Sequence, residues 1–161
     1  TTLSVARQMF PTAELVGGDL SPALLKNGHF VSEMMGLGIT FRQEDAVKVA
    51  EADGSVDAVI SYAVHHEMPP AVSAAMMKEM FRILAPNGEI VISDPPPFRA
   101  VNPMQAVVLD WDTDNRSEPF FSAAAMASLP QMLRDAGFVD VEEYALETRG
   151  YPWVTRGRKP A

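Results

Sequence analysis

The stretch ELVGGDLSPALL, residues 14–25, places an acidic residue between a short apolar run and the start of a helix. The run Glu14–Val16 predicts a strand, two glycines end it, and Asp19 follows. Ser21 and Pro22 then form a helix-start signal, because serine is a good N-cap and proline is tolerated in the first helical turn. The stretch therefore predicts a strand, an acidic turn and a helix.

The rest of the chain continues this alternation up to about residue 93, which indicates a parallel sheet with right-handed crossovers. The brief apolar run Ala58–Ile60 is typical of a strand covered on both faces. Further strands are predicted at Ile39–Gln43, Glu89–Ser93, Val139–Ala145 and Trp153–Arg158, and helices up to Phe10 and at Pro22–Met35, Val72–Leu84 and Ala123–Ala136.

Residues 94–121 interrupt the alternation. The run Asp94-Pro95-Pro96-Pro97 cannot continue a strand ladder, and a helical patch is predicted around Met104–Trp111. We interpret the segment as a substrate-side insertion at the carboxyl end of a strand. At 161 residues the chain is expected to form one domain, 1–161.

Composition excludes several classes of protein. Thirteen basic and twenty-one acidic residues leave a net charge of −8, which opposes binding to nucleic acid. No stretch approaches the roughly 18 apolar residues of a membrane span. The absence of cysteine excludes disulfides and thiolate metal sites and fits a reducing compartment. We therefore expect a cytoplasmic protein with neither nucleic-acid nor membrane partners.

Ligands of open parallel sheets bind beyond the carboxyl ends of the strands, so the residues there are the candidate site. Asp19 could accept hydrogen bonds from a ribose diol, or it could cap the following helix, a task for which Ser21 is equally suited. Asp45 could accept from the exocyclic amine of a base, with Ala46 leaving room for the ring, or it could cap a helix. These alternatives stay open.

His65-His66-Glu67 is a second candidate. An imidazole titrates near pH ~6.5, so either histidine could act as a general base, or it could simply bond to backbone at a helix start. A metal site is not predicted, because adjacent ligands are expected to point to different sides and the other histidine, His29, is distant in sequence.

Taken in order, these segments resemble the class I S-adenosylmethionine-dependent methyltransferases that act on small molecules. The resemblance implies a Rossmann-like α/β fold: a mostly parallel sheet with helices on both faces and a C-terminal antiparallel strand pair. The segments that carry it are FPTAELVGGDLSPALL, QEDA, DGSVDAVISYAVHHEMPP, MKEMFRILAPNGEIVISD and LRDAGFVDVEEYAL.

The resemblance also implies a cofactor, S-adenosylmethionine, a small-molecule methyl acceptor, and roles for single residues. His65 or His66 would be the base for the acceptor. The implied cofactor contacts are Asp19 at the ribose, Leu20 against the adenine, Asp45 at the adenine amine with Ala46 beside it, and Ser61 and Tyr62 beside the methionine portion.

One departure from the family pattern is important. The first strand and its glycine-rich loop, G-x-G-x-G, are absent and would precede residue 1, so the domain is expected to be N-terminally incomplete and inactive as given. Two alternatives follow: a nucleotide-dependent oxidoreductase on a similar sheet, or a non-catalytic, truncated domain. An exposed strand edge at Glu14–Val16 or its neighbour would pair with another chain and form a homodimer.

Overall fold

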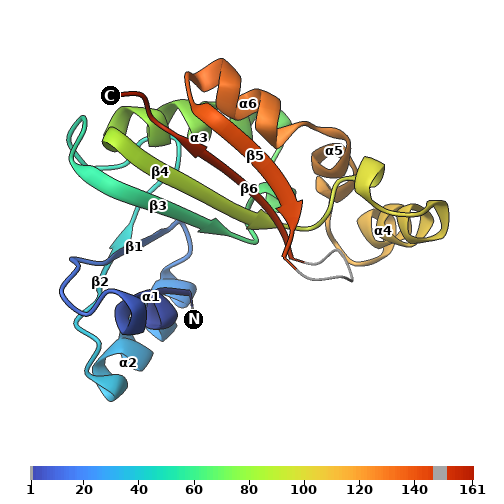
Figure 1. Cartoon of the computed structure of the whole chain (residues 1–161). Coiled ribbons are helices and arrows are strands. Elements are labelled where there is room, and N and C mark those ends of the chain that lie inside the picture. The colour runs from blue at the N-terminus through green and yellow to red at the C-terminus, as the bar shows by residue number, and fades with distance from the viewer. Residues whose placement is uncertain (1, 147–151) are drawn as a thin grey trace. The chain divides into compact units, whose positions relative to one another are not determined.

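The computed structural model describes residues 2–146 and 152–161 and divides the chain into two compact units, Thr1–Ala50 and Glu51–Ala161 (Figure 1). Each unit is an α/β structure with its own sheet. We describe the two units separately.

The first unit contains a two-stranded parallel sheet. Its strands pair in register from Val16↔Thr40 to Asp19↔Gln43, so the acidic residue of the opening stretch lies at the carboxyl end of its strand. Ser21 caps the second helix, which ends at Gly36 in a left-handed conformation with φ of 61°. The elements are α1 (Thr2–Met9), β1 (Val16–Asp19), α2 (Pro22–Met35) and β2 (Thr40–Gln43).

The first strand differs from the prediction, which ended it at Val16. β1 continues through both glycines to Asp19. The reason is close packing: a Cβ on Gly17 would lie 2.8 Å from the side chain of Leu3 and 2.9 Å from that of Phe41. The missing side chain of Gly17 therefore leaves room for Leu3 and Phe41 to pack against the strand, and the strand does not end at this glycine.

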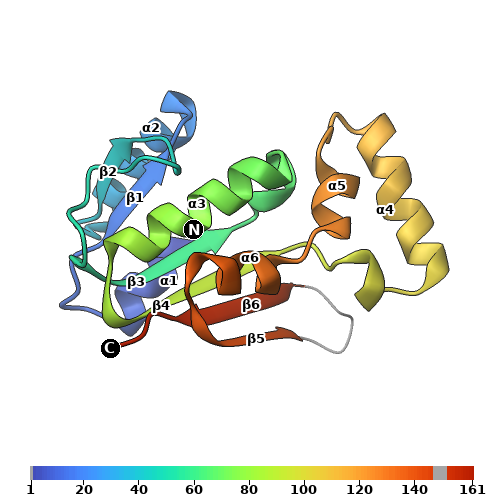
Figure 2. The same ribbon diagram turned by 90° about the horizontal axis from the view of Figure 1, so that it is seen from above.

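The second unit contains a four-stranded sheet of order β3-β4-β6-β5. β3 and β4 are parallel, whereas β6 runs antiparallel to both of its neighbours, which confirms the predicted antiparallel closing pair. Helices α3 and α6 pack side by side on one face of this sheet (Figure 2). The elements are β3 (Val56–Tyr62), η1 (His65–Glu67), α3 (Pro70–Ile83), β4 (Leu84–Asp94), η2 (Phe98–Ala100), α4 (Pro103–Asn115), α5 (Phe121–Met126), α6 (Leu129–Ala136), β5 (Val139–Ala145) and β6 (Trp153–Arg158).

The core of this unit forms between α3, α6 and the sheet. The apolar spacing that predicted α3 is confirmed, because the methionines on that face are buried and fill the space above the strands. Phe81 and Phe138 meet edge to face with ring centroids 5.1 Å apart. The largest fully buried apolar side chains are Met77, Leu84, Ile90, Ile92 and Leu133.

Two predictions about this unit are wrong. Ala58 and Ile60 are exposed instead of covered, because both point to one face of β3, whereas Val59 and the buried Ser61 point to the opposite, covered face. The helix predicted over Ala123–Ala136 is two helices, α5 and α6. Ser128 begins α6 by accepting a hydrogen bond from the backbone of Gln131, and Pro130 lacks the N–H that a continuous helix would need.

The segment after β4 forms η2, α4 and α5, which lie beyond the carboxyl end of that strand (Figures 1 and 2). α5 packs against η1, the turn that carries the histidine pair. Across the described ranges, no helix has the length and apolar character needed to cross a membrane.

Candidate functional site

The site begins with Asp94, the last residue of β4, which is only 6% exposed. Its Oδ2 accepts hydrogen bonds from the backbone N–H groups of Val64 (3.1 Å) and His65 (2.9 Å). A carboxylate is a strong acceptor for the free N–H groups at the start of a helical turn. Asp94 therefore fixes the start of η1, which follows the neighbouring strand β3.

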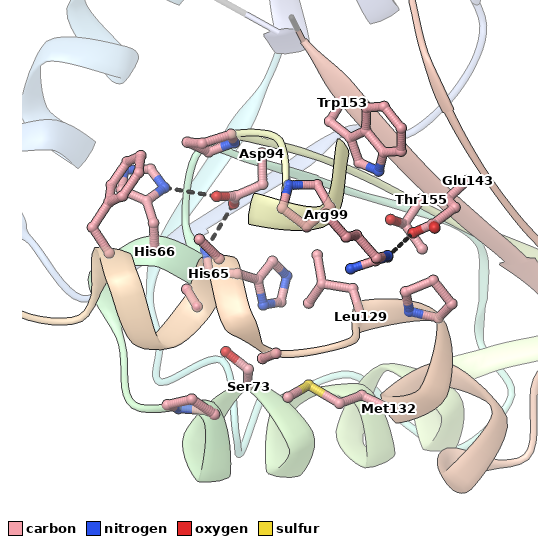
Figure 3. A pocket seen from close by; sticks show the side chains of 18 residues that line it. His65, His66, Ser73, Asp94, Arg99, Leu129, Met132, Glu143, Trp153 and Thr155 are labelled. Carbon is pink, nitrogen blue, oxygen red and sulfur yellow. Dashed lines mark hydrogen bonds and ion pairs between the residues drawn. The ribbon is translucent and has the colours of Figure 1, made fainter. Parts of the chain in front are cut away.

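The other oxygen of Asp94 holds His66. The distance from His66 Nδ1 to Asp94 Oδ1 is 2.7 Å (Figure 3). The ring also meets Phe121 of α5 edge to face at 5.5 Å. Because an ionised carboxylate only accepts, Nδ1 carries the proton of the neutral ring and Nε2 presents a lone pair. The hydrogen bond to Asp94 raises the pKa of His66, and the charges of Asp94, Glu67 and Glu118 act in the same direction.

His65 has the opposite environment. It is 2% exposed, and its Nε2 lies 3.3 Å from the hydroxyl of Ser61 inside the unit. Burial lowers the pKa of His65, so the ring is neutral near pH 7. The two histidines, equal candidates in the sequence, thus differ in their surroundings. His65 is buried in the interior of the unit, whereas the ring of His66 has the carboxylate of Asp94 as its partner (Figure 3).

The chain bends between β3 and η1 at Ala63, whose φ is 53°. Its N–H donates to Ser93 O on β4 at 2.8 Å, which ties the turn to the strand that ends in Asp94. A non-glycine residue in this left-handed region costs of order 1–3 kcal/mol and is often found at functional sites. The position of His66 therefore depends on a backbone conformation that the parallel pair β3–β4 maintains.

A small cavity lies beside this turn, lined by residues of η1, α3, α5, α6 and the ends of the strands (Figure 3). Its volume of about 30 Å³ has room for about two water molecules and is too small for an aromatic ring. Three buried polar atoms that lack a partner among the described residues belong to side chains on its wall: His65 Nδ1, Ser73 Oγ and Trp153 Nε1.

The first unit holds the two candidate aspartates. Asp19 Oδ1 accepts from the backbone N–H of Ser21 at 2.7 Å, and Asp45 Oδ1 accepts from that of Val47 at 3.1 Å. Neither caps a helix, since Ser21 is the N-cap of α2 and Asp45 lies in a turn outside any helix. Asp19 is the last residue of β1 and Asp45 lies two residues after the paired strand β2, and Glu44 N donates to Asp19 O at 3.1 Å.

The remaining predicted cofactor contacts have different surroundings. Leu20 is 63% exposed and Tyr62 52% exposed, whereas Ser61 is buried with its hydroxyl turned to His65. Ala46 follows Asp45 in the same turn.

Asp94 was one of the strand-end residues that the sequence marked by position, but no role was predicted for it. The signal was its place at the carboxyl end of the strand next to the one that leads to the histidines.

Comparison with known families identifies the domain. A family model described as a methyltransferase domain matches residues 1–88, more than half of the chain. The chain belongs to the methyltransferase domain family. The matched residues include Asp19, Asp45 and both histidines of the pair.

Two curated methyltransferases are similar in sequence. The demethylmenaquinone methyltransferase of Thermus thermophilus is 33% identical over 92 residues, which cover 56% of this chain and 40% of the relative. The ubiquinone/menaquinone biosynthesis C-methyltransferase of Desulfotalea psychrophila is 26% identical, covering 93% of this chain and 67% of the relative. The methyltransferase domain described here thus spans 40% of the first relative's length and about two thirds of the second's.

Solved structures share the fold. The S-adenosylmethionine-dependent methyltransferase SibL superposes with a TM-score of 0.74 at 18% identity, covering 99% of this chain and 47% of that one. A SAM-dependent methyltransferase from Methanosarcina mazei gives 0.70 at 17% identity, covering 99% and 86%. At these identities the comparison establishes the methyltransferase fold.

Proposed function

We propose that this chain is part of an S-adenosylmethionine-dependent methyltransferase that acts on a small molecule, with His66 as the general base. The observation that carries the proposal is the 2.7 Å contact between Asp94 Oδ1 and His66 Nδ1, which leaves Nε2 as the atom that can take a proton. The match to a methyltransferase family model and the methyltransferase names of both curated relatives support it.

The residues at the carboxyl ends of β1 and β2 fit the nucleoside part of such a cofactor. Beyond its contact with Ser21 N, the side chain of Asp19 has no hydrogen bond to any described residue, so lone pairs remain for a ribose diol. The exposed Leu20 offers an apolar surface for a base. We assign the adenine amine to Asp45 with Ala46 beside it, and the methionine portion to Ser61 and Tyr62, from their positions at strand ends.

When bound, S-adenosylmethionine supplies an electrophilic methyl group on a positively charged sulfur. The residues of this chain contribute position and proton transfer. Asp94 fixes the tautomer and orientation of His66, and the Nε2 atom takes the proton of the acceptor. The carboxylate then stabilises the imidazolium that forms, because it is buried and bonded to that ring.

The acceptor that suits this base carries an ionisable hydroxyl. Removing the proton from a ring hydroxyl makes both that oxygen and the adjacent ring carbons more nucleophilic. The relatives' names, a demethylmenaquinone methyltransferase and a C-methyltransferase of ubiquinone and menaquinone biosynthesis, support a hydroxylated ring of the quinol type, the reduced form of a quinone, as acceptor. We place the protein in the cytoplasm, which the absence of cysteine supports, and propose a homodimer through a strand edge.

Calorimetric titration with S-adenosylhomocysteine tests the cofactor assignment, using both this chain and the complete gene product that carries it. We expect saturable binding by the complete product and a clear loss of affinity in Asp19→Ala. Glu33→Ala, which removes an exposed acid from α2 of the same unit, is the matched control. Binding of NADH in place of S-adenosylhomocysteine would overturn the proposal, and unchanged affinity in Asp19→Ala would remove the ribose role.

A further inference from the structure

Three metal-ligating side chains of the second unit meet beside the proposed base. One ligand atom each from His66, Glu67 and Glu118 lies within 4.8 Å of the other two. His66 and Glu67 belong to the turn η1, and Glu118 comes from the loop between α4 and α5. We propose that these three residues form a binding site for a divalent transition-metal ion of the Zn²⁺ type, and that the bound ion occupies Nε2 of His66.

The spacing of the ligand atoms suits such an ion. Two ligand atoms that each lie about 2.1 Å from a tetrahedral Zn²⁺ are about 3.4 Å apart. The distance between His66 Nε2 and Glu67 Oε1 is 3.5 Å. The expectation that adjacent residues point to different sides is therefore wrong for this pair, because the tight turn η1 lets both side chains reach the same point.

Asp94 supports the proposed site by holding the ring nitrogen of His66 that does not face the ion. Histidines that bind metals usually donate their other ring N–H to a carboxylate, which fixes the tautomer and directs the free nitrogen at the ion. Asp94 provides this contact to Nδ1 of His66 at 2.7 Å. Asp94 is itself held by two backbone N–H groups, so the ring orientation is set before any ion arrives.

Glu118 supplies an independent reason for a cation. Its Oε2 is shielded from solvent and has no hydrogen-bond partner within the part of the chain that the structure describes. A buried carboxylate oxygen without a partner carries a desolvation cost that a coordinated cation would offset.

The ligand set decides the kind of cation. Imidazole nitrogen suits Zn²⁺ and other late first-row ions, whereas Mg²⁺ prefers oxygen ligands in octahedral geometry. One nitrogen and two carboxylates with a fourth position for water resemble the open zinc sites of proteins in donor type. Zn²⁺ should therefore bind in preference to Mg²⁺.

The consequence for activity rests on the proposed role of His66. An ion on Nε2 removes the lone pair that would take the acceptor's proton, so the bound ion should inhibit proton transfer reversibly. Metal binding itself needs neither cofactor nor acceptor, so the two proposals can be tested separately. Direct titration with the metal tests the ion site even if methyl transfer is never observed.

The test is calorimetric titration of the chelator-treated chain with Zn²⁺, repeated with Mg²⁺. We expect one Zn²⁺ ion per chain and weaker binding of Mg²⁺. Asp94→Asn should weaken Zn²⁺ binding by about 10–100-fold, the range for loss of the carboxylate that orients a ligating histidine. Glu118→Gln, which removes a ligand carboxylate, should weaken it at least as much. Glu89→Gln, which changes an exposed acid on β4, should leave the affinity unchanged. Circular dichroism establishes that each variant is folded.

Substitution by Co²⁺ provides a second measurement for the same site. A nitrogen-bound, four-coordinate Co²⁺ absorbs in the visible range, and this absorption should be lost in His66→Gln while it persists in His29→Gln. Absence of saturable Zn²⁺ binding, or an affinity that neither Glu118→Gln nor His66→Gln alters, would overturn the site.

Discussion

Asp94 is hydrogen-bonded to Nδ1 of His66 at 2.7 Å and, through its second oxygen, to the backbone of the turn that carries that ring. The residues are 28 positions apart in sequence, and the parallel pairing of β3 with β4 brings them together. The carboxylate of Asp94 thus fixes the backbone of the turn, and it also sets the tautomer and basicity of the His66 imidazole.

The first prediction concerns the basicity of His66. Asp94→Asn removes the negative charge that raises the pKa of His66, so the titration midpoint of the ring should fall. NMR of the imidazole resonances from pH 5 to 9 measures it. Asp53→Asn, a change to an exposed acid that pairs with Arg82, is the control and should not move the midpoint. A midpoint that stays in place in Asp94→Asn would show that the contact does not set the pKa.

The second prediction concerns activity. His66→Gln in a methyl-transferring form of the protein should reduce kcat by about 10²–10⁴-fold, the usual contribution of a general base. Affinity for S-adenosylhomocysteine should change little, since the ring is assigned to the acceptor. His29→Gln, at an exposed position of α2, should behave like the wild type. Full activity in His66→Gln would exclude the base role.

The third prediction concerns stability against pH. The pKa of His66 is raised in the folded chain, so its contribution is complete below the unfolded value of 6.5 and is lost as the pH rises through the folded pKa. The pKa of His65 is lowered, so its contribution is complete above 6.5 and is lost as the pH falls through its folded pKa. Together the pair should favour the folded state most near pH 6.5.

Urea unfolding between pH 5 and 9 measures these opposite slopes. His66→Gln should remove the loss on the alkaline side only, and His65→Gln should flatten the acid side while lowering stability at every pH, because its ring is buried. Identical pH profiles in the two variants would contradict the assignment.

The fourth prediction concerns the C-terminal segment. Lys159 Nζ donates to the carbonyl oxygens of Phe81 (2.7 Å) and Leu84 (2.6 Å) at the end of α3 and lies 4.9 Å from the centre of the Phe81 ring. Lys159→Met keeps the apolar stem but removes these charged hydrogen bonds, so the free energy of unfolding should fall by about 2 kcal/mol. Lys78→Met, on the same helix, should change it far less.

The fifth prediction concerns the end of α6. Gly137 has φ of 107°, and a Cβ there would lie 3.0 Å from the ring of Phe81. Gly137→Ala should therefore destabilise the unit by about 1–2 kcal/mol, since it adds backbone strain and a close contact. Thermal unfolding measures the effect. Gly36 also has a positive φ, 61°, but a Cβ there would meet nothing within 4 Å, so Gly36→Ala should cost less.

Element types could be predicted because they depend on local signals. α2 has its predicted bounds, since Ser21 caps its start and Gly36 ends it in a conformation that glycine adopts easily. β5 and β6 likewise match. The break between α5 and α6 also has a local signal, Ser128 and Pro130, although a single helix was predicted there.

The packing errors have a different origin. The glycines of β1 suggested a strand end, yet Gly17 is required by the side chains of Leu3 and Phe41, which come from other elements. The apolar run in β3 suggested a strand covered on both faces, yet Ala58 and Ile60 on one of its faces are exposed. An apolar run alone does not tell which faces of a strand other elements will cover.

The sequence by itself determined the α/β class, the order of the elements and the set of residues at the carboxyl ends of the strands, because these follow from local propensity and periodicity. Only the tertiary structure decided which histidine has a partner. His65 and His66 are adjacent and chemically identical, and burial beside Ser61 and a bond to Asp94 make them different. That difference arises from parallel strand pairing across 28 residues, which no local pattern encodes.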